Sequence, residues 1–508
     1  MKVNFIGTRY LTELLLPRMA EGSAIGSIAS TAAMGWSRVN TSAAVLDAVI
    51  QPIGRPAKPE EQVFFSGRDQ QPVRELPQRC GNQRRWRTPG PAGDGPPAGA
   101  GGMTGNRSRV PPPACALRDK AAIIGIGETD YAEDYHSART RAPGAIPLTA
   151  ESLSVTAFER ALADSGLRRA DIDGISVSYI YGGPPPEEMA SLLGLQPRYA
   201  ITNGNIMAGP LPAVCADIAA GKADTVAMIY AAASRAIGRQ YGGQTYTGDQ
   251  AGTPASYYYY HPWGFSSQAA HWAMVCTYYL NQFGLTEDDL AEVAIQLRKN
   301  ALLNPNAIMK TPMTLADYRA SRYIVRPLHL LDMCLVNDGA VCLIVRKAEL
   351  SRHLAHPAVL VSGWGEAEVK QNKLHVLVRE RLRPQIQESL AQCLAMAGAE
   401  FSEIGHFEGY DAASMHLVTQ IEGFGFAEPG TALARFRSGD FSPGGLLPVN
   451  TAGGMISGAY MHGWNQVVEI VRQLRHEAGP RQIKGLQMSL SSLAQTDASH
   501  PILYRRGA

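Results

Sequence analysis

The chain has 508 residues, of which 45% are apolar and 18% charged, so it can bury a large core in two or three domains. The formal net charge is +2, and outside one arginine-rich stretch near the N-terminus no basic stripe with interleaved aromatic residues is present. The seven cysteines lack metal-type spacing, no apolar run can span a bilayer, and no signal peptide is evident. We therefore expect a reduced, cytoplasmic protein with no metal and no nucleic-acid or membrane partner.

Residues 1–65 contain two short fragments with recognisable sequence patterns. Residues 3–36 predict a helix followed by a strand rich in serine, and residues 51–65 form a second fragment. The two fragments resemble the middle and the C-terminal part of a short-chain dehydrogenase. The glycine-rich nucleotide turn and the Tyr-x-x-x-Lys pair of that family are absent, so we expect a truncated remnant without hydride chemistry.

Residues 66–118 are dominated by Pro, Gly, Arg and Gln, as in the stretch from Arg84 to Arg87. Such a composition cannot bury enough apolar surface to fold, so we predict a disordered leader. A functional nucleic-acid arm is the less favoured alternative, because only composition supports it. We interpret Met103 as a plausible natural start and expect the residues before about 118 to be dispensable.

Strand and helix patterns alternate from about Asp119 to the C-terminus. Short apolar runs predict strands at 121–127, 175–177, 225–229, 341–345, 359–361 and 486–490. Helical spacing predicts helices at 148–165, 212–220, 287–302, 385–397 and 466–475, the first stopped by Gly166. This alternation indicates layered α/β packing with a mostly parallel sheet. It occurs twice with a break near 351–357, so we expect two similar halves, 119–350 and 351–508.

A glycine-rich stretch runs from Pro448 to Gly463 and contains the pair Gly453 and Gly454. It resembles the active-site loop Gly-Gly-x-x-Ser-x-Gly-His-Pro-x-Gly of thiolases, with Tyr460 in the place of the catalytic His. Residues 300–307, 326–340 and 466–475 add to the resemblance, which is to the thiolase-like family of SCP-x and lipid-transfer proteins. The resemblance implies the five-layered α/β/α/β/α thiolase fold and a homodimer.

Both catalytic cysteines of thiolases are missing from the matching positions. The first position falls on Ile206 or Met207, with a one-residue ambiguity, and neither side chain can attack a thioester. The second corresponds to residues 490–492. The nearest thiol, Cys215, lies inside a predicted helix, where we expect a buried packing residue. The Asn or His of a further thiolase motif is replaced by Tyr410, which is followed by Asp411.

This replacement pattern resembles the steroid side-chain aldolase branch of the lipid-transfer-protein family. The resemblance implies retro-aldol cleavage of a β-hydroxyacyl-CoA, of which a 17-hydroxy steroid C22-CoA giving a 17-ketosteroid and propionyl-CoA is our expected case. It further implies a small partner with a zinc-ribbon element and an OB-fold, forming a heterotetramer with the homodimer. No cofactor is expected, since coenzyme A is part of the acyl-CoA thioester substrate.

Retro-aldol chemistry needs one proton removed from the hydroxyl group and one delivered to the α-carbon, and a phenol can donate or accept. We assign Tyr410 and Tyr460 to these transfers without choosing the base. Free Tyr has a pKa of roughly 10, so a base at neutral pH needs about 4 kcal/mol of phenolate stabilisation. We expect Gly453 and Gly454 to let backbone N–H groups approach the thioester oxygen.

Several assignments stay open on the sequence. His462 either supports the site or faces solvent, and Asp411 is interpreted as orienting the segment of Tyr410. The aromatic run from Tyr257 to Tyr260 is expected to pack or to form an interface. Two other functions remain: a catalytically silent acyl-CoA-binding subunit, and, less favoured, a true 3-ketoacyl-CoA thiolase.

Overall fold

The computed structural model describes residues 23–25, 50–52, 116–140, 148–180, 182–204, 206–238, 268–352, 354–368, 379–494 and 498–507. The chain divides into two compact units, Met1–Pro111 and Pro112–Ala508. In the first unit the described residues form one antiparallel pair, β1 (Ser23–Ile25) with β2 (Ile50–Pro52). The rest of the dehydrogenase-like remnant, nearly all of the leader and the run Tyr257–Tyr260 lie outside the described residues.

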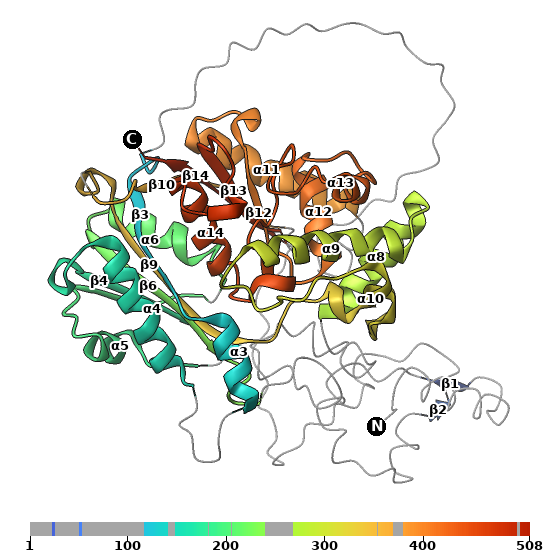
Figure 1. Ribbon diagram of the computed structural model, residues 1–508, viewed down its shortest axis with the longest axis horizontal. Coiled ribbons are helices and arrows are strands. Elements are labelled where there is room, and N and C mark those ends of the chain that lie inside the picture. The colour runs from blue at the N-terminus through green and yellow to red at the C-terminus, as the bar shows by residue number, and fades with distance from the viewer. Residues whose placement is uncertain are drawn as a thin grey trace, which may run out of the picture. The chain divides into compact units, whose positions relative to one another are not determined.

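A ten-stranded sheet organises the second unit, in the order β12-β13-β14-β10-β3-β9-β6-β4-β5 with β11 beside β14 (Figure 1). The strands of the first half are β3 (Ala121–Glu128), β4 (Gly174–Tyr179), β5 (Tyr199–Thr202), β6 (Thr225–Ala233) and β9 (Asp338–Lys347). Those of the second half are β10 (Val359–Trp364), β11 (Ala367–Glu368), β12 (Phe407–Gly409), β13 (Met488–Ala494) and β14 (Ala498–Arg506). The halves join through β3 and β10, which share two residue pairs.

The prediction of a mostly parallel sheet is wrong. Along the sheet only β12–β13, β4–β5 and β4–β6 pair in parallel, and the other neighbours are antiparallel. One cause is the long excursion between β6 and β9, after which the chain re-enters the sheet in the opposite direction. Another is the close succession of β13 and β14, because a short connection between neighbouring strands requires antiparallel pairing.

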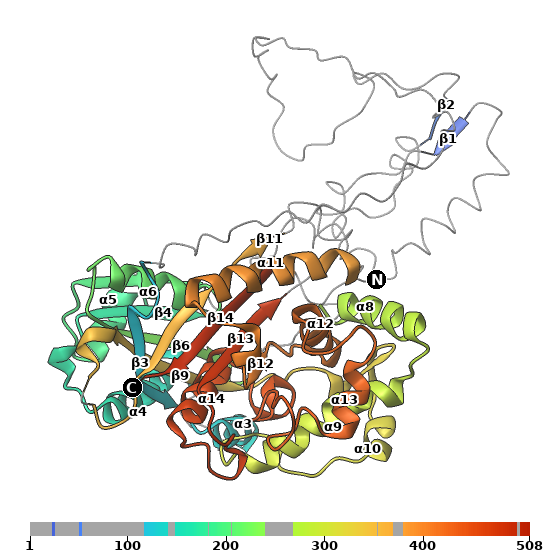
Figure 2. The ribbon, with the colours of Figure 1, turned by 90° about the horizontal axis from the view of Figure 1, so that it is seen from above.

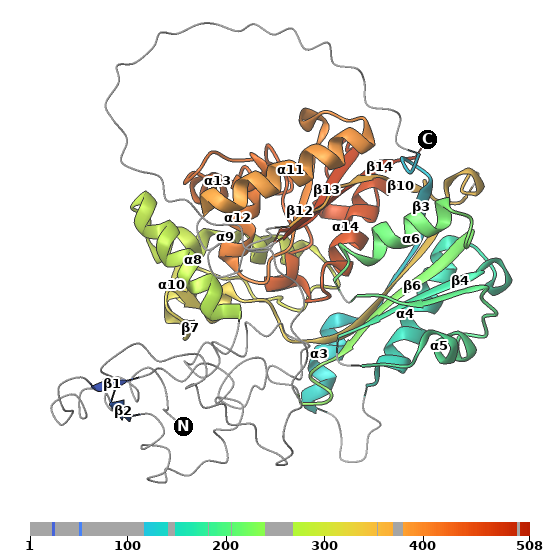
Figure 3. The same ribbon diagram turned by 180° about the vertical axis from the view of Figure 1, so that it is seen from behind.

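Helices form three layers around this sheet, as the thiolase-like expectation implied. α6 (Pro210–Ala219) and α14 (Trp464–Arg475) lie between the two halves and share one apolar cluster with strands of both (Figure 3). α4 (Ala150–Ser165) and α5 (Pro186–Leu192) cover the outer face of the first half. α11 (Arg379–Ala397) lies across β10 and β14, and α12 (Ser414–Phe424) packs beside it (Figure 2).

The remaining helices belong to the excursion and to the connections. They are α3 (Tyr131–Thr140), α8 (Gln268–Phe283), α9 (Glu287–Leu303), α10 (Leu315–Ala320) and α13 (Ala432–Ser438). α8, α9 and α10 lie on the side of α12 and α13 (Figure 1). No helix in the described ranges combines the length and apolar composition needed to cross a bilayer.

Local signals explain where two of the predicted helices begin and end. At α4 the side chain of Thr149 accepts from the N–H of Ser152, and Gly166 closes the helix with φ +69°. At α9 the Oγ1 of Thr286 donates to Asp289, whose carboxylate also accepts from the Thr286 N–H. Such N-terminal caps are worth about 1 kcal/mol each, and the left-handed end favours glycine.

Candidate active site

Tyr410 and Tyr460 meet at their hydroxyl groups. Tyr410 follows β12 directly and is buried, whereas Tyr460 is half-buried and follows the turn Gly454–Gly458. The two phenol oxygens are 3.0 Å apart, although the residues are 50 positions apart in the chain. The rings stand edge to face with centroids 6.4 Å apart. One hydroxyl must donate to the other at this distance, so the pair shares a hydrogen bond.

The backbone around Tyr410 is held by hydrogen bonds on both sides. The N–H of Tyr410 donates to Ser492 O at 3.0 Å, and the Nε2 of Gln420 donates to Tyr410 O at 2.7 Å. The preceding Gly409 exchanges two bonds with the side-chain amide of Asn450, at 2.8 and 2.9 Å. All of these groups are buried, so the phenol starts from an immobilised main chain.

The glycines of the loop are required by close packing. Gly453 and Gly454 have φ of +95° and +58°, in the left-handed region that favours glycine. A Cβ on Gly453 would lie 2.5 Å from Cβ of Ala301, and one on Gly454 would lie 2.2 Å from Oδ2 of Asp411. The N–H of Gly453 already donates to Asn450 O at 2.9 Å. The N–H of Gly453 is thus engaged within the loop, while the approach of other backbone N–H groups of the loop to a substrate oxygen stays a prediction.

Asp411 connects the end of β12 to the loop. Its carboxylate accepts the N–H of Met455 at 2.9 Å and that of Ile456 at 3.2 Å. Burial raises the pKa of Asp411 to about 7, against the lowering effect of these backbone bonds. Asp411 thus fixes the loop to the segment that carries Tyr410, and it uses N–H groups that could otherwise face a substrate.

His462 is buried beside Tyr460, so it does not face bulk solvent. Its Nδ1 lies 3.1 Å from the hydroxyl of Tyr230, which comes from β6. Its ring stands edge-on to that of Tyr460, with centroids 4.7 Å apart, and its carbonyl accepts the N–H of Met207 at 3.1 Å. Burial lowers the pKa of His462 to about 3, so the imidazole is neutral at physiological pH.

No thiol occupies the place of the nucleophile. Met207 is buried, and Ile206 packs partly buried against the cluster that contains Tyr410. Cys215 is buried in α6, and burial raises the pKa of its thiol. Its assignment as a packing residue is confirmed by its place in the central apolar cluster.

Cys334 is a neighbour of the site that sequence reasoning missed. It packs, partly exposed, against the buried cluster that contains Tyr410, as Tyr460 also does. Burial, followed by the charge of Asp411, raises the pKa of its thiol to about 12. A thiol with so high a pKa is a poor nucleophile at neutral pH, because the thiolate is the reactive form. Its position within the family motif gave no signal of this proximity.

A small cavity adjoins the buried phenol. Its volume is ≈ 20 Å³, which is room for about one water molecule. It is lined by Ile206, Met207, Ala208, Tyr410, His462, Gly463, Gln466, Val467, Ser491, Ser492 and Leu493. The cavity is thus bordered by both positions at which thiolases carry a catalytic cysteine, and also by Tyr410 and His462. A larger cavity of ≈ 480 Å³ is lined by residues of 277–288 and Pro327, none of which belongs to this site.

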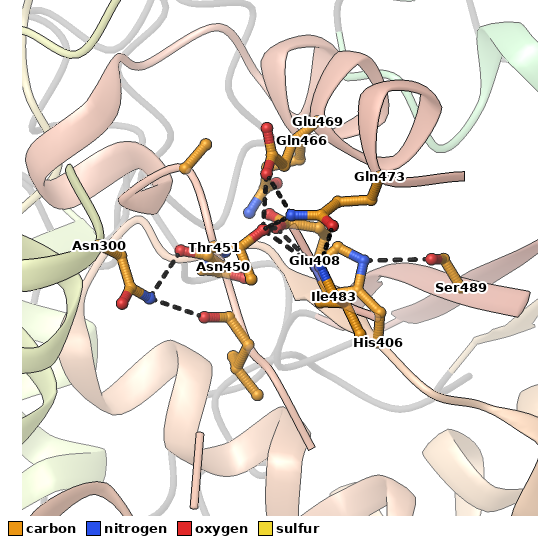
Figure 4. A network of polar contacts seen from close by, with 12 residues as sticks. Asn300, His406, Glu408, Asn450, Thr451, Gln466, Glu469, Gln473, Ile483 and Ser489 are labelled. Atoms are coloured by element: carbon orange, nitrogen blue, oxygen red, sulfur yellow. Dashed lines mark hydrogen bonds and ion pairs between the residues drawn. The ribbon is translucent and has the colours of Figure 1, made fainter. Parts of the chain in front are cut away.

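A buried polar network supports the loop from the side of β12 and α14 (Figure 4). Thr451 donates its N–H to Glu408 at 2.9 Å and its hydroxyl to Glu469 at 2.7 Å. Glu469 is paired with Arg481 by bonds of 2.8 to 3.1 Å, and His406 lies 3.1 Å from Glu408. Among the described residues no group of three or more His, Cys, Asp or Glu is arranged to hold a metal ion.

Comparisons with known proteins show to which family the chain is similar. Residues 368–499 match the family model described as "Thiolase C-terminal domain-like". The chain is 32% identical over 371 residues to the steroid side-chain-cleaving aldolase of Thermomonospora curvata, covering 71% of this chain and 91% of that protein. It is 31% identical over 374 residues to the 17-hydroxy-3-oxo-4-pregnene-20-carboxyl-CoA lyase of Mycobacterium tuberculosis, covering 71% and 92%.

Solved structures give the same relationship. The "Ltp2-ChsH2(DUF35) aldolase" superposes with a TM-score of 0.66 at 28% identity, over 77% of this chain and 99% of that one. Human mitochondrial 3-ketoacyl-CoA thiolase shares the fold, with a TM-score of 0.56 at 13% identity over 78% and 99% of the chains. The chain therefore belongs to the thiolase-like SCP-x and lipid-transfer-protein family, in the branch of the steroid side-chain-cleaving aldolases.

Proposed function

We propose that the protein is a carbon–carbon lyase that cleaves the side chain of a β-hydroxyacyl-CoA by a retro-aldol reaction. One phenol of the pair Tyr410 and Tyr460 removes the proton of the β-hydroxyl group. The Cα–Cβ bond then breaks, the hydroxyl carbon becomes a ketone, and the electron pair of the bond forms the enolate of the thioester. A proton delivered to the α-carbon releases the shortened acyl-CoA.

One observation carries this proposal: two phenol oxygens 3.0 Å apart at a site where hydrophobic side chains replace the thiolase nucleophile. Acyl transfer needs a nucleophile, whereas retro-aldol cleavage needs only proton transfer and enolate stabilisation. A hydrogen bond to an ionised group is worth about 1.5–3 kcal/mol, so the neighbouring hydroxyl supplies a substantial part of the phenolate stabilisation that such a base requires.

The substrate class comes from the relatives. Two of them are a steroid side-chain-cleaving aldolase and a lyase of 17-hydroxy-3-oxo-4-pregnene-20-carboxyl-CoA. We propose a 17-hydroxy steroid C22-CoA here too, giving a 17-ketosteroid and propionyl-CoA. Since the cavity of ≈ 20 Å³ cannot hold a steroid, we propose that the substrate enters past the half-buried Tyr460.

The assembly we propose is a homodimer with a small partner. The similar aldolase of known structure is named for two proteins, Ltp2 and the DUF35 protein ChsH2. We propose a zinc-ribbon and OB-fold partner of the DUF35 kind, in a heterotetramer that completes the substrate pocket, and no cofactor beyond the CoA of the substrate. A cytoplasmic location is part of the same proposal.

The test is incubation of the protein and its DUF35-type partner with 17-hydroxy-3-oxo-4-pregnene-20-carboxyl-CoA, followed by mass spectrometry of the products. We expect equal amounts of a 17-ketosteroid and propionyl-CoA, without a requirement for free CoA. Thiolysis of a 3-ketoacyl-CoA by free CoA, with the hydroxy ester left intact, would reject the lyase. Binding of both esters without turnover of either would identify a silent subunit.

A further inference from the structure

A hydrogen-bonded imidazole joins the two halves of the chain at the site. Tyr230 lies in β6 of the first half, and His462 lies in the loop of the second half. The hydroxyl of Tyr230 and Nδ1 of His462 are 3.1 Å apart and buried. The residues are separated by 232 positions, so the contact exists only in the folded chain.

The ring of Tyr230 is held rigidly. It is fully buried in β6 and stacks on Trp464 with centroids 5.6 Å apart and an interplanar angle of 21°. His462 is fixed as well, since its carbonyl accepts the N–H of Met207. The bond between hydroxyl and imidazole therefore keeps one geometry, and its direction decides which ring nitrogen of His462 carries the proton.

The second ring nitrogen of His462 is available. In the described part of the chain Nε2 has no hydrogen-bond partner, and the side chain lines the small cavity together with Tyr410. Nδ1 can accept from the phenol, and in that tautomer the proton of the neutral imidazole resides on Nε2. An N–H donor then borders the place where the proposed reaction develops enolate charge, and a neutral imidazole can polarise a carbonyl.

We propose that Tyr230 is a positioning residue that holds His462 as the Nε2–H tautomer, so that His462 donates a hydrogen bond to the thioester oxygen. The inference deepens the proposed lyase function and rests on it for the kinetic test. It assigns to His462 the donor role that the N–H of Gly453 cannot take, because that group is bonded to Asn450 O.

The kinetic test uses Tyr230→Phe in the protein–partner complex with the 17-hydroxy steroid ester. We expect kcat to fall about 10-fold to 100-fold with KM nearly unchanged, since a transition-state donor is weakened. In the background His462→Gln, whose amide donates without tautomers, adding Tyr230→Phe changes kcat by less than about twofold. A merely structural role of Tyr230 predicts equal losses in both backgrounds, and that result would overturn the proposal.

Tyr504→Phe is the matched control. Like Tyr230, Tyr504 is fully buried in the central apolar cluster, and its hydroxyl lies 3.0 Å from Ser491 Oγ. The substitution removes this one hydroxyl group. We expect this variant to keep wild-type kcat and to lose about as much thermal stability as Tyr230→Phe. Equal kinetic losses in the two variants would reject a specific role for Tyr230.

A second readout does not require turnover. An ester that lacks the 17-hydroxyl group and carries ¹³C at the thioester carbonyl cannot be cleaved, and its C=O stretch reports hydrogen bonding. We expect a lowered frequency on wild type and on Tyr504→Phe, and a return toward the free value on Tyr230→Phe and His462→Ala. If this dependence appears without lyase activity, the lyase function fails and the inference stands. If wild type cleaves the 17-hydroxy ester but the carbonyl frequency is unchanged in Tyr230→Phe, the lyase function stands and the inference fails.

Discussion

At the residue scale, the proposed chemistry depends on the hydrogen atom between the oxygens of Tyr410 and Tyr460. Their separation of 3.0 Å lets one hydroxyl donate a hydrogen bond to the other, so the two groups assigned to the proton transfers are in direct contact. The phenolate that removes the substrate proton can be stabilised by a hydrogen bond from its neighbour, which no single tyrosine could provide. The buried main chain of Tyr410 and the half-buried position of Tyr460 also differ, so the pair has one inner and one outer member.

Removing either hydroxyl tests this pair. Tyr410→Phe and Tyr460→Phe are each expected to lower kcat by at least about 100-fold, because a positioned acid or base contributes about 10²–10⁴. The double variant is expected to be little worse than the worse single variant, since the two groups act as a unit. The measurement is steady-state release of propionyl-CoA. Wild-type turnover by both single variants, in an intact assembly, would contradict the assignment.

The sequence was sufficient to single out Tyr410 and Tyr460 as candidates, because each occupies a fixed place in a motif that local spacing preserves. It could not find Tyr230 or Cys334. Tyr230 reaches His462 from another half of the fold, and Cys334 reaches the site through backbone pairing of Cys334 N with Ala412 O. Contacts of this kind depend on strand order and register, which spacing along the chain does not encode.

At the element scale, the loop after Asn450 is supported by β12 on one side and α14 on the other. The ion pair of Glu469 with Arg481 lies at the centre of this support and is buried. Burial alone would raise the pKa of Glu469, but the charge and hydrogen bonds of Arg481 lower it. Removing one partner of such a pair leaves an uncompensated charge in a dry environment.

Arg481→Met is therefore expected to lower stability by about 3–5 kcal/mol, measured by denaturant or thermal unfolding. The double variant Glu469→Gln, Arg481→Met should recover much of this loss, since no buried charge remains. Arg168→Met is the exposed comparison, as Arg168 pairs with Asp171 while 81% of its side chain is accessible. Its loss is expected to change stability far less than Arg481→Met does, because an exposed ion pair is solvated and screened. An equal effect of Arg168→Met and Arg481→Met would contradict the role of the buried pair.

Asp411 gives a prediction on pH, because burial raises its pKa from 3.8 to about 7. Between these values the folded state binds a proton that the unfolded state has released, so this group makes stability fall as pH rises from about 4 to 7. The melting temperature of wild type relative to Asp411→Asn is thus expected to be higher at pH 5 than at pH 8. Asp288→Asn serves as the control, since Arg319 lowers the pKa of that carboxyl. A pH-independent difference between wild type and Asp411→Asn would contradict the assignment.

Six of the ten strands in the large sheet and five of the eleven α-helices among the described residues were predicted, and the failures have physical causes. α12 was missed because all of its residues are buried, so it lacks the polar stripe that marks an amphipathic helix. β14 was missed because Pro501 and charged residues interrupt its apolar pattern. Parallel and antiparallel pairing produce similar apolar runs in a buried sheet, which explains the error in strand direction.

At the scale of the whole molecule, the described site draws only on the unit Pro112–Ala508. The ten-stranded sheet, the central helices and both tyrosines all lie in it. That the residues before about 118 are dispensable stays a prediction. The final strand, in contrast, is expected to be required for folding, because β14 lies between β13 and β10 and is paired on both sides.

Two truncations test this contrast. A chain beginning at Met103 is expected to keep the kcat and melting temperature of the full chain in the presence of the partner. A chain ending before Ala498 removes β14 and is expected to fail to fold, since two neighbouring strands lose their partner. Circular dichroism and activity measure both. Loss of turnover by the shortened but folded first chain would show that the leader takes part.

The two halves, which join through β3 and β10, each contribute part of the site, so the polypeptide could be divided between them. Tyr230 and Met207 are contributed from before the connection of Lys347 to Val359, whereas Tyr410, Tyr460 and His462 come from after it. A gene severed in that connection would encode two fragments, each with an incomplete set of groups. Only their reassembly would restore turnover, so such a split protein would report complementation between its fragments.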